Sequence, residues 1–180
     1  MIKDSKSAES LAKILSEALP YIQKFSGKIV VIKYGGSAMK ENKLRQNFAR
    51  DIALMRQIGI FPVLVHGGGP QIERNLKKSN IKSVFIDGLR KTDENSIKTI
   101  VKTLREVNGD IAELIKTWGA RTKTFNDVRE SILICKKIKT KIDLGFVGDI
   151  TKVDGSLIKK NIFSGKIPVI APIGRDRFGL

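Results

Sequence analysis

Two glycine-rich stretches hold the residues of this chain that are best suited to chemistry. "KYGGS" spans residues 33–37 and "HGGGP" spans residues 66–70, and each follows a short apolar run. A glycine inside regular structure costs roughly 0.5 to 1 kcal/mol relative to alanine, so consecutive glycines indicate that something approaches the backbone closely. Unpaired amides at the start of a helix bind anions, since the N–H groups and the helix dipole both favour negative charge. The two stretches therefore predict sites for a phosphate or a carboxylate.

One basic residue could act on the same anions, because Lys33 lies shortly before the first glycine pair. A second basic residue, Arg90, lies in the predicted hairpin segment "GLRKT". An arginine fork suits a carboxylate, because two of its N–H groups pair with the two oxygens. Taken alone, Lys33 is more often a surface lysine and Arg90 more often a partner in a hairpin ion pair. Neither glycine stretch matches the P-loop or the dinucleotide fingerprint, so these nucleotide motifs do not apply.

The segments around these residues alternate between helices and strands. Apolar periodicity predicts helices at 8–25, 42–59, 70–79, 93–117 and 155–163, with Pro20 as an interruption of the first. It predicts strands at 28–34, 61–65, 130–138 and 143–153, and a last strand within 166–174 that ends in a loop. It also predicts a hairpin over 84–92 that turns at Asp87 and Gly88. The strand–helix–strand order implies a parallel sheet with right-handed crossovers. Both glycine stretches then lie at the carboxyl ends of strands, the edge where open α/β sheets bind ligands.

Composition and charge narrow the class of protein. The chain has 180 residues, 41% of them hydrophobic, and this length suits one globular unit. The formal charge of +16 could indicate a nucleic-acid partner, but the lysines are scattered and not interleaved with aromatic residues. We therefore favour a solvated lysine surface over nucleic-acid binding. The single cysteine, Cys135, and the lack of an apolar run of about 18 residues predict a cytoplasmic protein without a membrane anchor.

Three further polar residues receive structural interpretations. His66 is the one histidine of the chain, and a lone histidine at a strand end more often orders a loop than acts as a base. Asp149 and Asp154 are expected to be loop and turn carboxylates. No residue is predicted to bind a metal.

Five segments together resemble the acetylglutamate kinase branch of the amino-acid kinase family. They are "VIKYGGSAM", "PVLVHGGGPQI", "DGLRKT", "DLGFVGDIT" and "IPVIAPIG", in family-like order and spacing. The resemblance implies an α/β fold, a three-layer αβα sandwich with a mostly parallel central sheet. It implies an enzyme of arginine biosynthesis that uses ATP with Mg²⁺ to phosphorylate the side-chain carboxylate of N-acetyl-L-glutamate.

The resemblance also implies a role for each candidate site residue. Lys33 corresponds to the lysine that stabilises charge on the transferring phosphoryl group, and Gly35 and Gly36 correspond to backbone donors around that group. The substrate-binding residues are Gly67, Gly68, Gly69 and Arg90.

The resemblance divides the chain into two parts. Residues 1–27 are similar to the helical extension of arginine-inhibited members, which joins dimers into a hexamer and helps to shape the site for L-arginine. Residues 28–180 correspond to the amino-terminal, substrate-binding domain, and the sequence stops before the ATP-binding half. We expect a homo-oligomer, a dimer or a hexamer. Two alternatives stay open: an aspartate or glutamate kinase of the same family, or a non-catalytic basic or regulatory module.

Overall fold

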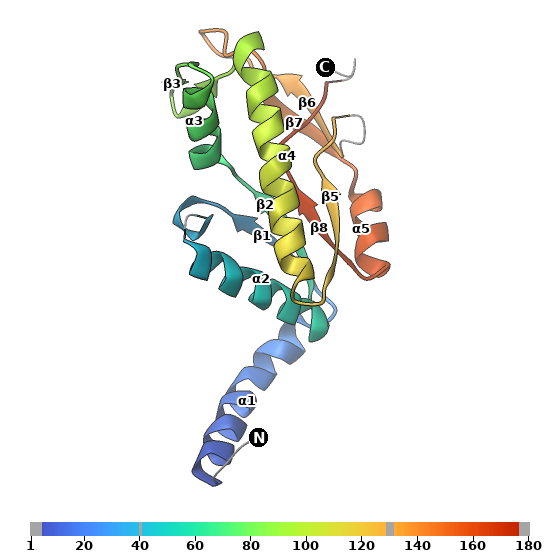
Figure 1. Ribbon diagram of the computed structural model, residues 1–180. Helices are drawn as coiled ribbons and strands as arrows, with labels where there is room; N and C mark the ends of the chain where they lie inside the picture. Colours follow the sequence, from blue (N-terminus) through green and yellow to red (C-terminus); the bar gives the residue numbers. More distant parts are fainter. Residues whose placement is uncertain (1–4, 40, 129–131, 177–180) are drawn as a thin grey trace.

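The computed structural model describes residues 5–39, 41–128 and 132–176 (Figure 1). The elements follow the chain in this order: α1 (Ser5–Phe25), β1 (Ile29–Tyr34), η1 (Gly36–Met39), α2 (Asn42–Gln57), β2 (Phe61–His66), α3 (Gly69–Lys78), β3 (Val84–Ile86), β4 (Leu89–Lys91), α4 (Glu94–Lys116), β5 (Arg121–Phe125), β6 (Leu133–Lys137), β7 (Gly148–Val153), α5 (Gly155–Phe163) and β8 (Lys166–Ile170).

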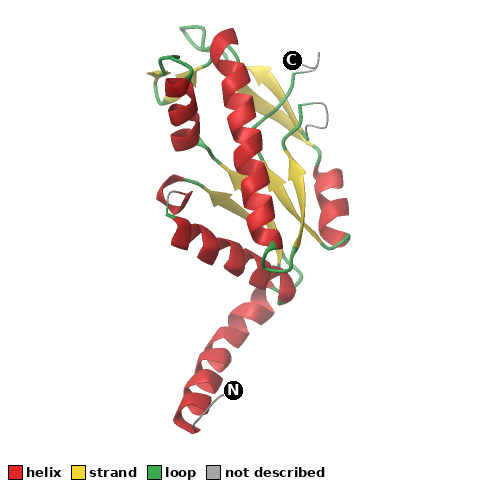
Figure 2. Cartoon of the chain, in the orientation of Figure 1, coloured by secondary structure: helices red, strands yellow, loops and turns green. Residues whose placement is uncertain are grey.

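A parallel sheet of four strands, in the order β1-β2-β8-β5, forms the middle layer. Helices α2 and α4 pack on one face, and α5 packs on the other (Figure 2). The predicted α/β fold with helices on both sides of a parallel sheet is confirmed. The order β1-α2-β2 follows from alternating apolar periodicities, because a parallel neighbour can be reached only through a crossover.

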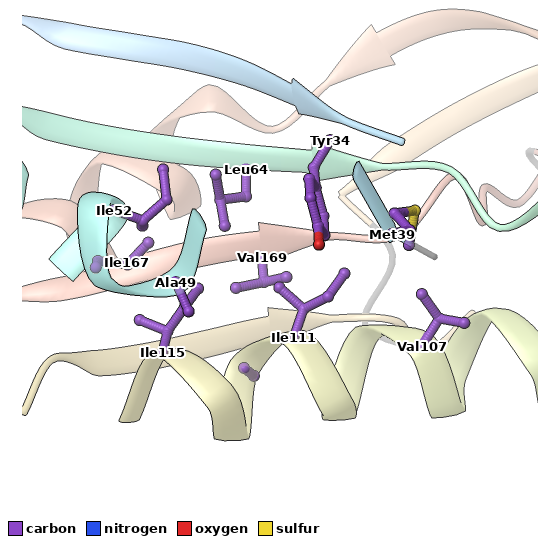
Figure 3. Packing of buried hydrophobic residues seen from close by; sticks show 11 residues of the cluster. Tyr34, Met39, Ala49, Ile52, Leu64, Val107, Ile111, Ile115, Ile167 and Val169 are labelled. Carbon is purple, nitrogen blue, oxygen red and sulfur yellow. The ribbon is translucent and has the colours of Figure 1, made fainter. Parts of the chain in front are cut away.

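The main core lies between the sheet and the two long helices. Ile111 and Ile115 of α4 and Ile52 of α2 meet the buried strand residues Leu64 and Val169 (Figure 3). Ile115, Leu64 and Val169 have no exposed surface. Full burial of such a side chain contributes about 1.5 to 3 kcal/mol, so this face fixes the sheet against its helices.

The opposite face is covered less completely. Ile29, Val31 and Lys33 of β1 point to this side and are exposed, Val31 by 67%. Helix α5 packs over Val63 and Ile170, nearer the other end of the strand order. The β1 side of the sheet is therefore open to solvent in the described chain.

A two-stranded hairpin and a second small sheet flank the central sheet. Asp87 and Gly88 turn the β3–β4 hairpin with φ angles of 50° and 79°, as the Asp-Gly pair predicted. Thr92 then ties the hairpin to a distant segment, because its N–H donates to Leu144 O at 2.8 Å and its carbonyl oxygen accepts from Phe146 N at 2.7 Å.

The helix boundaries follow from capping residues. The Asp93 carboxylate accepts from the N–H of Ser96 at 2.8 Å and begins α4, while Asp154 accepts from Leu157 N at 3.0 Å and begins α5. Asp154 is thus a capping carboxylate at the turn before α5. Gly59, with φ of 86°, follows the end of α2 as expected.

Several predicted boundaries were wrong. Pro20 does not interrupt α1, because one missing N–H removes a single hydrogen bond from a helix of 21 residues. The strand predicted over 143–153 begins only at Gly148, so Asp149 lies in β7 and not in a loop. The strand predicted over 130–138 spans Leu133–Lys137 among the described residues. Residues 166–174, predicted as a strand that ends in a loop, form a strand over Lys166–Ile170.

Helix α1 projects away from the rest of the molecule (Figure 1). Its apolar side chains Ile14, Leu15 and Leu19 are exposed by 59%, 58% and 50%. No helix in the described part of the chain is long and apolar enough to cross a membrane.

Candidate functional site

The two glycine turns lie side by side at the carboxyl edge of the sheet. Strands β1 and β2 pair in parallel with Tyr34 opposite His66, so both turns leave the sheet at the same level. The N–H of Gly67 donates to the carbonyl oxygen of Tyr34 at 2.9 Å, and a Cβ on Gly35 would lie 4.0 Å from Gly67 N. The predicted position of both turns at one edge of a parallel sheet is confirmed.

The first turn carries the candidate lysine. Lys33 is exposed on the open face of β1, and no carboxylate among the described residues forms an ion pair with it. The next residue, Tyr34, points to the helical side, where its ring stacks on Phe48 at 3.8 Å. Gly36 has φ of 64°, a left-handed conformation that favours glycine, and it starts the short helix η1. The ammonium group of Lys33 is thus free to meet an anion at this turn.

The second turn rests on a buried polar network. The Asn108 amide nitrogen donates to His66 Nε2 at 2.9 Å and to Val169 O at 3.1 Å. Because Nε2 accepts, Nδ1 carries the ring proton and donates to Gly67 O at 2.6 Å. Burial lowers the pKa of His66, so the ring is neutral at pH 7. These contacts agree with the structural interpretation of His66.

Asn108 is a residue of the site region that sequence reasoning missed. It is fully buried on α4, between apolar residues such as Leu104 and Ile111. The signal was present, since an asparagine on the apolar face of an amphipathic helix needs a buried hydrogen-bond partner. The sequence could not say which partner, because His66 lies 42 residues away in the chain.

The three glycines of the second turn differ in their surroundings. A Cβ on Gly68 would lie 2.9 Å from Leu104 Cδ2, whereas one on Gly67 or Gly69 would have no neighbour within 4 Å. Helix α3 begins at Gly69, and no side chain of the described residues caps it. First-turn N–H groups of a helix have no intrahelical acceptor, so they remain available to an anion.

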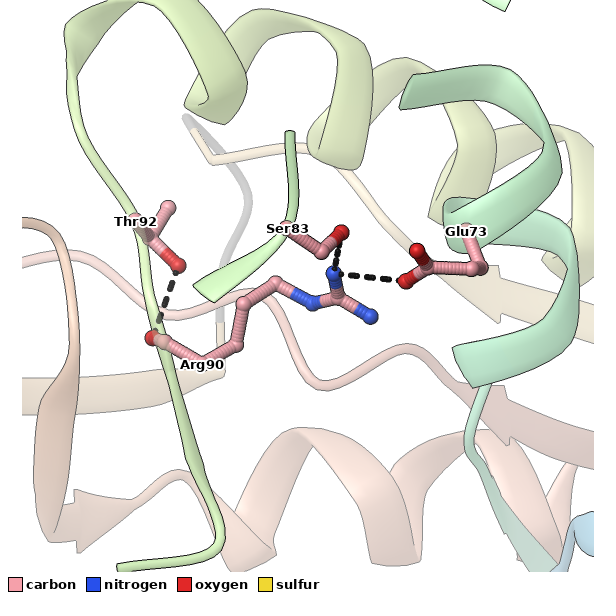
Figure 4. Close-up of polar contacts among 4 residues, drawn as sticks. All are labelled: Glu73, Ser83, Arg90 and Thr92. Atoms are coloured by element: carbon pink, nitrogen blue, oxygen red, sulfur yellow. Dashed lines mark hydrogen bonds and ion pairs between the residues drawn. The ribbon is translucent and has the colours of Figure 1, made fainter. Parts of the chain in front are cut away.

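The candidate arginine lies in the β3–β4 hairpin, beside α3. Arg90 Nη1 donates to Glu73 Oε2 at 3.1 Å and to the hydroxyl oxygen of Ser83 (Figure 4). The guanidinium carbon lies 4.5 Å from the centre of the Phe85 ring. Hydrogen bonds from Ser83 and Arg90 lower the pKa of Glu73, which therefore stays ionised at neutral pH. The ion pair considered for Arg90 is present, but its partner lies on α3 and not within the hairpin. Among the described residues, Nε and Nη2 of Arg90 make no hydrogen bond.

A cavity of about 320 Å³ lies behind the two turns. It is lined by Tyr34, Met39, Arg45, Pro70, Gln71, Arg74, Val107, Asp110 and Ile111. Lys33 and Arg90 do not line it, so the structure brings the glycine turns together without enclosing the predicted residues in one pocket. The described residues contain no group of three or more His, Cys, Asp or Glu side chains that could hold a metal ion.

This edge of glycine turns on a parallel sheet is that of a known class of enzymes. The amino acid kinase family model matches residues 28–179, and the chain belongs to that family. The match begins directly after α1, while the division into an extension and a substrate-binding domain remains a prediction.

Relatives narrow the comparison within the family. An acetylglutamate kinase of Clostridium beijerinckii is 45% identical over 163 residues, which cover 90% of this chain and 57% of the relative. The acetylglutamate kinase of Stutzerimonas stutzeri is 44% identical, over 97% of this chain and 62% of the relative. The chain thus spans about 57% to 62% of the length of these curated relatives.

Solved structures agree on the fold. The N-acetylglutamate synthase of Neisseria gonorrhoeae, complexed with coenzyme A and N-acetyl-glutamate, superposes with a TM-score of 0.79 over 92% of this chain and 38% of that protein. At 24% sequence identity, this similarity shows that the two proteins share a fold, and it assigns no ligand to this chain.

Proposed function

We propose that this chain forms the substrate-binding part of an acetylglutamate kinase. The whole enzyme transfers a phosphoryl group from ATP to the side-chain carboxylate of N-acetyl-L-glutamate, a step of arginine biosynthesis in the cytoplasm. The observation that carries the proposal is the pair of adjacent glycine turns at one sheet edge, with Lys33 on the first and Arg90 beside the helix that follows the second. The 42% to 45% identity to acetylglutamate kinases supports the choice of substrate.

The residues suit phosphoryl transfer to a carboxylate. This reaction needs positioning and neutralisation of the phosphoryl oxygens more than covalent help. Lys33 supplies a mobile positive charge, and the amides at Gly35 and Gly36 supply fixed donors. The attacking carboxylate is already ionised at neutral pH, so no base is required. His66, which is buried and occupied by two hydrogen bonds, stays outside the reaction.

Arg90 and the second turn are assigned to the substrate. The guanidinium holds a substrate carboxylate by two parallel N–H bonds. The backbone at Gly67 and Gly69 has no neighbour where a side chain would stand, so a ligand can lie against it.

ATP and Mg²⁺ relate differently to these residues. Backbone amides and an ammonium group are donors to anion oxygens, and they fit the phosphates of ATP. They offer no oxygen ligands to Mg²⁺, which prefers carboxylates and water. The donor set described at the turns therefore does not fit the ion, and no step is assigned to it.

Substrate preference tests the proposal. The full-length protein is assayed for ADP release with N-acetyl-L-glutamate, glutamate and aspartate. We expect N-acetyl-L-glutamate to give the highest kcat/KM by a wide margin. A preference for glutamate or aspartate would assign the chain to another member of the family, and no ADP release with any of them would favour a regulatory module.

We also propose that α1 joins dimers into a hexamer and that L-arginine inhibits the kinase activity of this hexamer. The exposed stripe of Ile14, Leu15 and Leu19 supports a contact between copies, because a twofold contact sets the same surface against itself. Leu15→Glu places a charge in each such contact twice, so it should convert the hexamer to a dimer and weaken inhibition, with basal activity retained. Light scattering with an arginine titration measures both, and unchanged mass and inhibition would remove α1 from the assembly.

A further inference from the structure

The guanidinium of Arg90 is hydrogen-bonded through one of its three nitrogen atoms. Nη1 makes both of its hydrogen bonds, to Glu73 and to Ser83, whereas Nε and Nη2 make none within the described ranges. The ring of Phe85 covers one face of the group at 4.5 Å. A guanidinium is planar and carries five N–H donors, so fixing one corner and one face also fixes the direction of the remaining edge. Figure 4 shows Arg90 and Glu73 pointing toward each other, with Ser83 beside them.

The two partners of the ion pair differ in exposure. The Arg90 side chain is 14% exposed, whereas that of Glu73 is 55% exposed. An exposed carboxylate contributes little to the stability of a fold through a single ion pair. The effect of Glu73 is therefore expected on the orientation of Arg90 and not on folding.

The contact joins the two parts of the candidate substrate site. Glu73 lies on α3, about one turn after Gly69, and Arg90 lies on β4. Ser83 comes from the segment between α3 and β3 and contacts both charged groups. The ion pair thus ties the carboxylate-binding hairpin to the helix whose first turn offers free amides.

We propose that Glu73 is a positioning residue that presents the free Nε–Nη2 edge of Arg90 to a carboxylate of the substrate. The proposal rests on the function assigned above. A carboxylate on that edge accepts two parallel N–H bonds, while Glu73 stays on Nη1 and does not touch the substrate. Because Arg90 is already ordered, binding does not have to immobilise a long side chain.

Two substitutions in the full-length enzyme separate geometry from charge. Glu73→Ala should raise the KM for N-acetyl-L-glutamate about 3- to 10-fold and leave kcat within about twofold, because only the ordering of Arg90 is lost. Glu73→Gln should stay within about twofold of the wild type, since its amide oxygen still accepts from Nη1. Glu113→Ala, which removes an exposed carboxylate paired with Lys116, is the matched control.

The sign of the effect decides between two roles for Glu73. If Glu73 instead occupied the place of the substrate carboxylate, Glu73→Ala would lower KM. A lower or unchanged KM in Glu73→Ala therefore overturns the proposal.

A second measurement needs no substrate. Nitrogen-15 relaxation of the arginine Nε–Hε groups, with Arg90→Lys to identify the signal, reports how firmly the Arg90 side chain is held. We expect a high order parameter, about 0.8, in the wild type and in Glu73→Gln, and one below about 0.6 in Glu73→Ala. Equal order parameters in all three proteins would overturn the positioning role, even if the enzyme phosphorylates N-acetyl-L-glutamate. Failure to phosphorylate that substrate would overturn the proposed function and leave this test intact.

Discussion

The two glycine turns are neighbours, but they are built differently. Beneath the second turn, Asn108 is fully buried and links His66 to Val169, and the His66 ring holds the carbonyl oxygen of Gly67. The turn is therefore held from below by hydrogen bonds between buried groups. Its position is set before any ligand arrives.

The first turn is fixed on one side only. Tyr34 stacks on Phe48 and its hydroxyl donates to Ala38 O at 3.0 Å, which anchors the helical side. On the other side Lys33 stands in solvent, and Gly36 adopts a left-handed conformation. This turn combines a charged group with a backbone conformation that favours glycine, and no buried polar network lies beneath them among the described residues.

The difference shows how a site can combine rigidity with charge. Amides can be fixed by a buried network, because neutral groups with partners tolerate burial. A lysine cannot be placed there at the same cost, since burial disfavours its charged form. The chain therefore provides a rigid platform at the second turn and a solvated charge at the first.

Loss of the charge should have the largest effect. Lys33→Ala in the full-length enzyme should lower kcat with N-acetyl-L-glutamate by roughly a hundred- to a thousandfold, with a smaller change in KM, because the ammonium acts mainly in the transition state. A coupled ADP-release assay measures it. Lys28→Ala, which removes an exposed lysine just before the opposite end of β1, should leave kcat nearly unchanged. Near-normal turnover of Lys33→Ala would remove Lys33 from the mechanism.

Loss of the buried network should have the largest effect on folding. Asn108→Ala leaves His66 Nε2 and Val169 O without their buried donor, and should lower the free energy of unfolding by about 2 to 4 kcal/mol. Urea denaturation measures this change. Asn95→Ala, an exposed position on the same helix, should change stability by no more than about 0.5 kcal/mol. Equal effects of the two substitutions would show that the network does not support the turn.

Glycine should be required for a different reason in each turn, and substitutions of Gly36 and Gly68 test this. Gly36→Ala should cost about 1 to 2 kcal/mol because of its positive φ, and Gly36→Asn should cost less, since asparagine tolerates this conformation. Gly68→Ala should cost about 1 kcal/mol through contact with Leu104, and Gly68→Asn should cost more, because its side chain is larger.

Thermal or urea unfolding of the four glycine variants gives the comparison. Gly69→Ala, which meets no atom within 4 Å, should leave stability unchanged. If asparagine is less destabilising than alanine at both Gly36 and Gly68, the two glycines are not required for different reasons, a positive φ at Gly36 and lack of space at Gly68.

Protonation of His66 should have the smallest effect. Its pKa lies below the ordinary 6.5, so the unfolded chain binds the proton more tightly than the folded one. The contribution of His66 to the free energy of unfolding is therefore complete above pH 6.5, and it decreases as the pH falls from 6.5 through the lower pKa of the folded state. Urea midpoints at about pH 7.5 and about pH 5.5 should differ in the wild type more than in His66→Gln. A ring pKa above 6.5 in an NMR titration would contradict this sign.

Most elements around the two turns could be predicted from the sequence. The glycine turns, the Asp87–Gly88 hairpin and the parallel strands were predicted, because each depends on short-range patterns. Strand β5 was missed, since "RTKTF" alternates charged and threonine side chains. Such a polar pattern is tolerated because β5 is an edge strand, which within the described part of the chain pairs with β8 alone.

The candidate site divides in the same way. Lys33 and the glycines were singled out from residue type and spacing, and Arg90 from the family resemblance, whereas Asn108 and Glu73 became visible only in the folded chain. Their roles as partners depend on contacts across 42 and 17 residues, which no local pattern encodes.

By itself, the sequence determined the order of the elements apart from β5, and it located the glycine turns at the carboxyl ends of two strands, because periodicity and turn chemistry act over a few residues. Only the tertiary structure decided that Lys33 faces solvent while Tyr34 faces the core, that Asn108 lies under His66, and that Glu73 holds one corner of Arg90. The physical reason is that side-chain partners are selected by packing between elements, and packing exists only once the whole chain has folded.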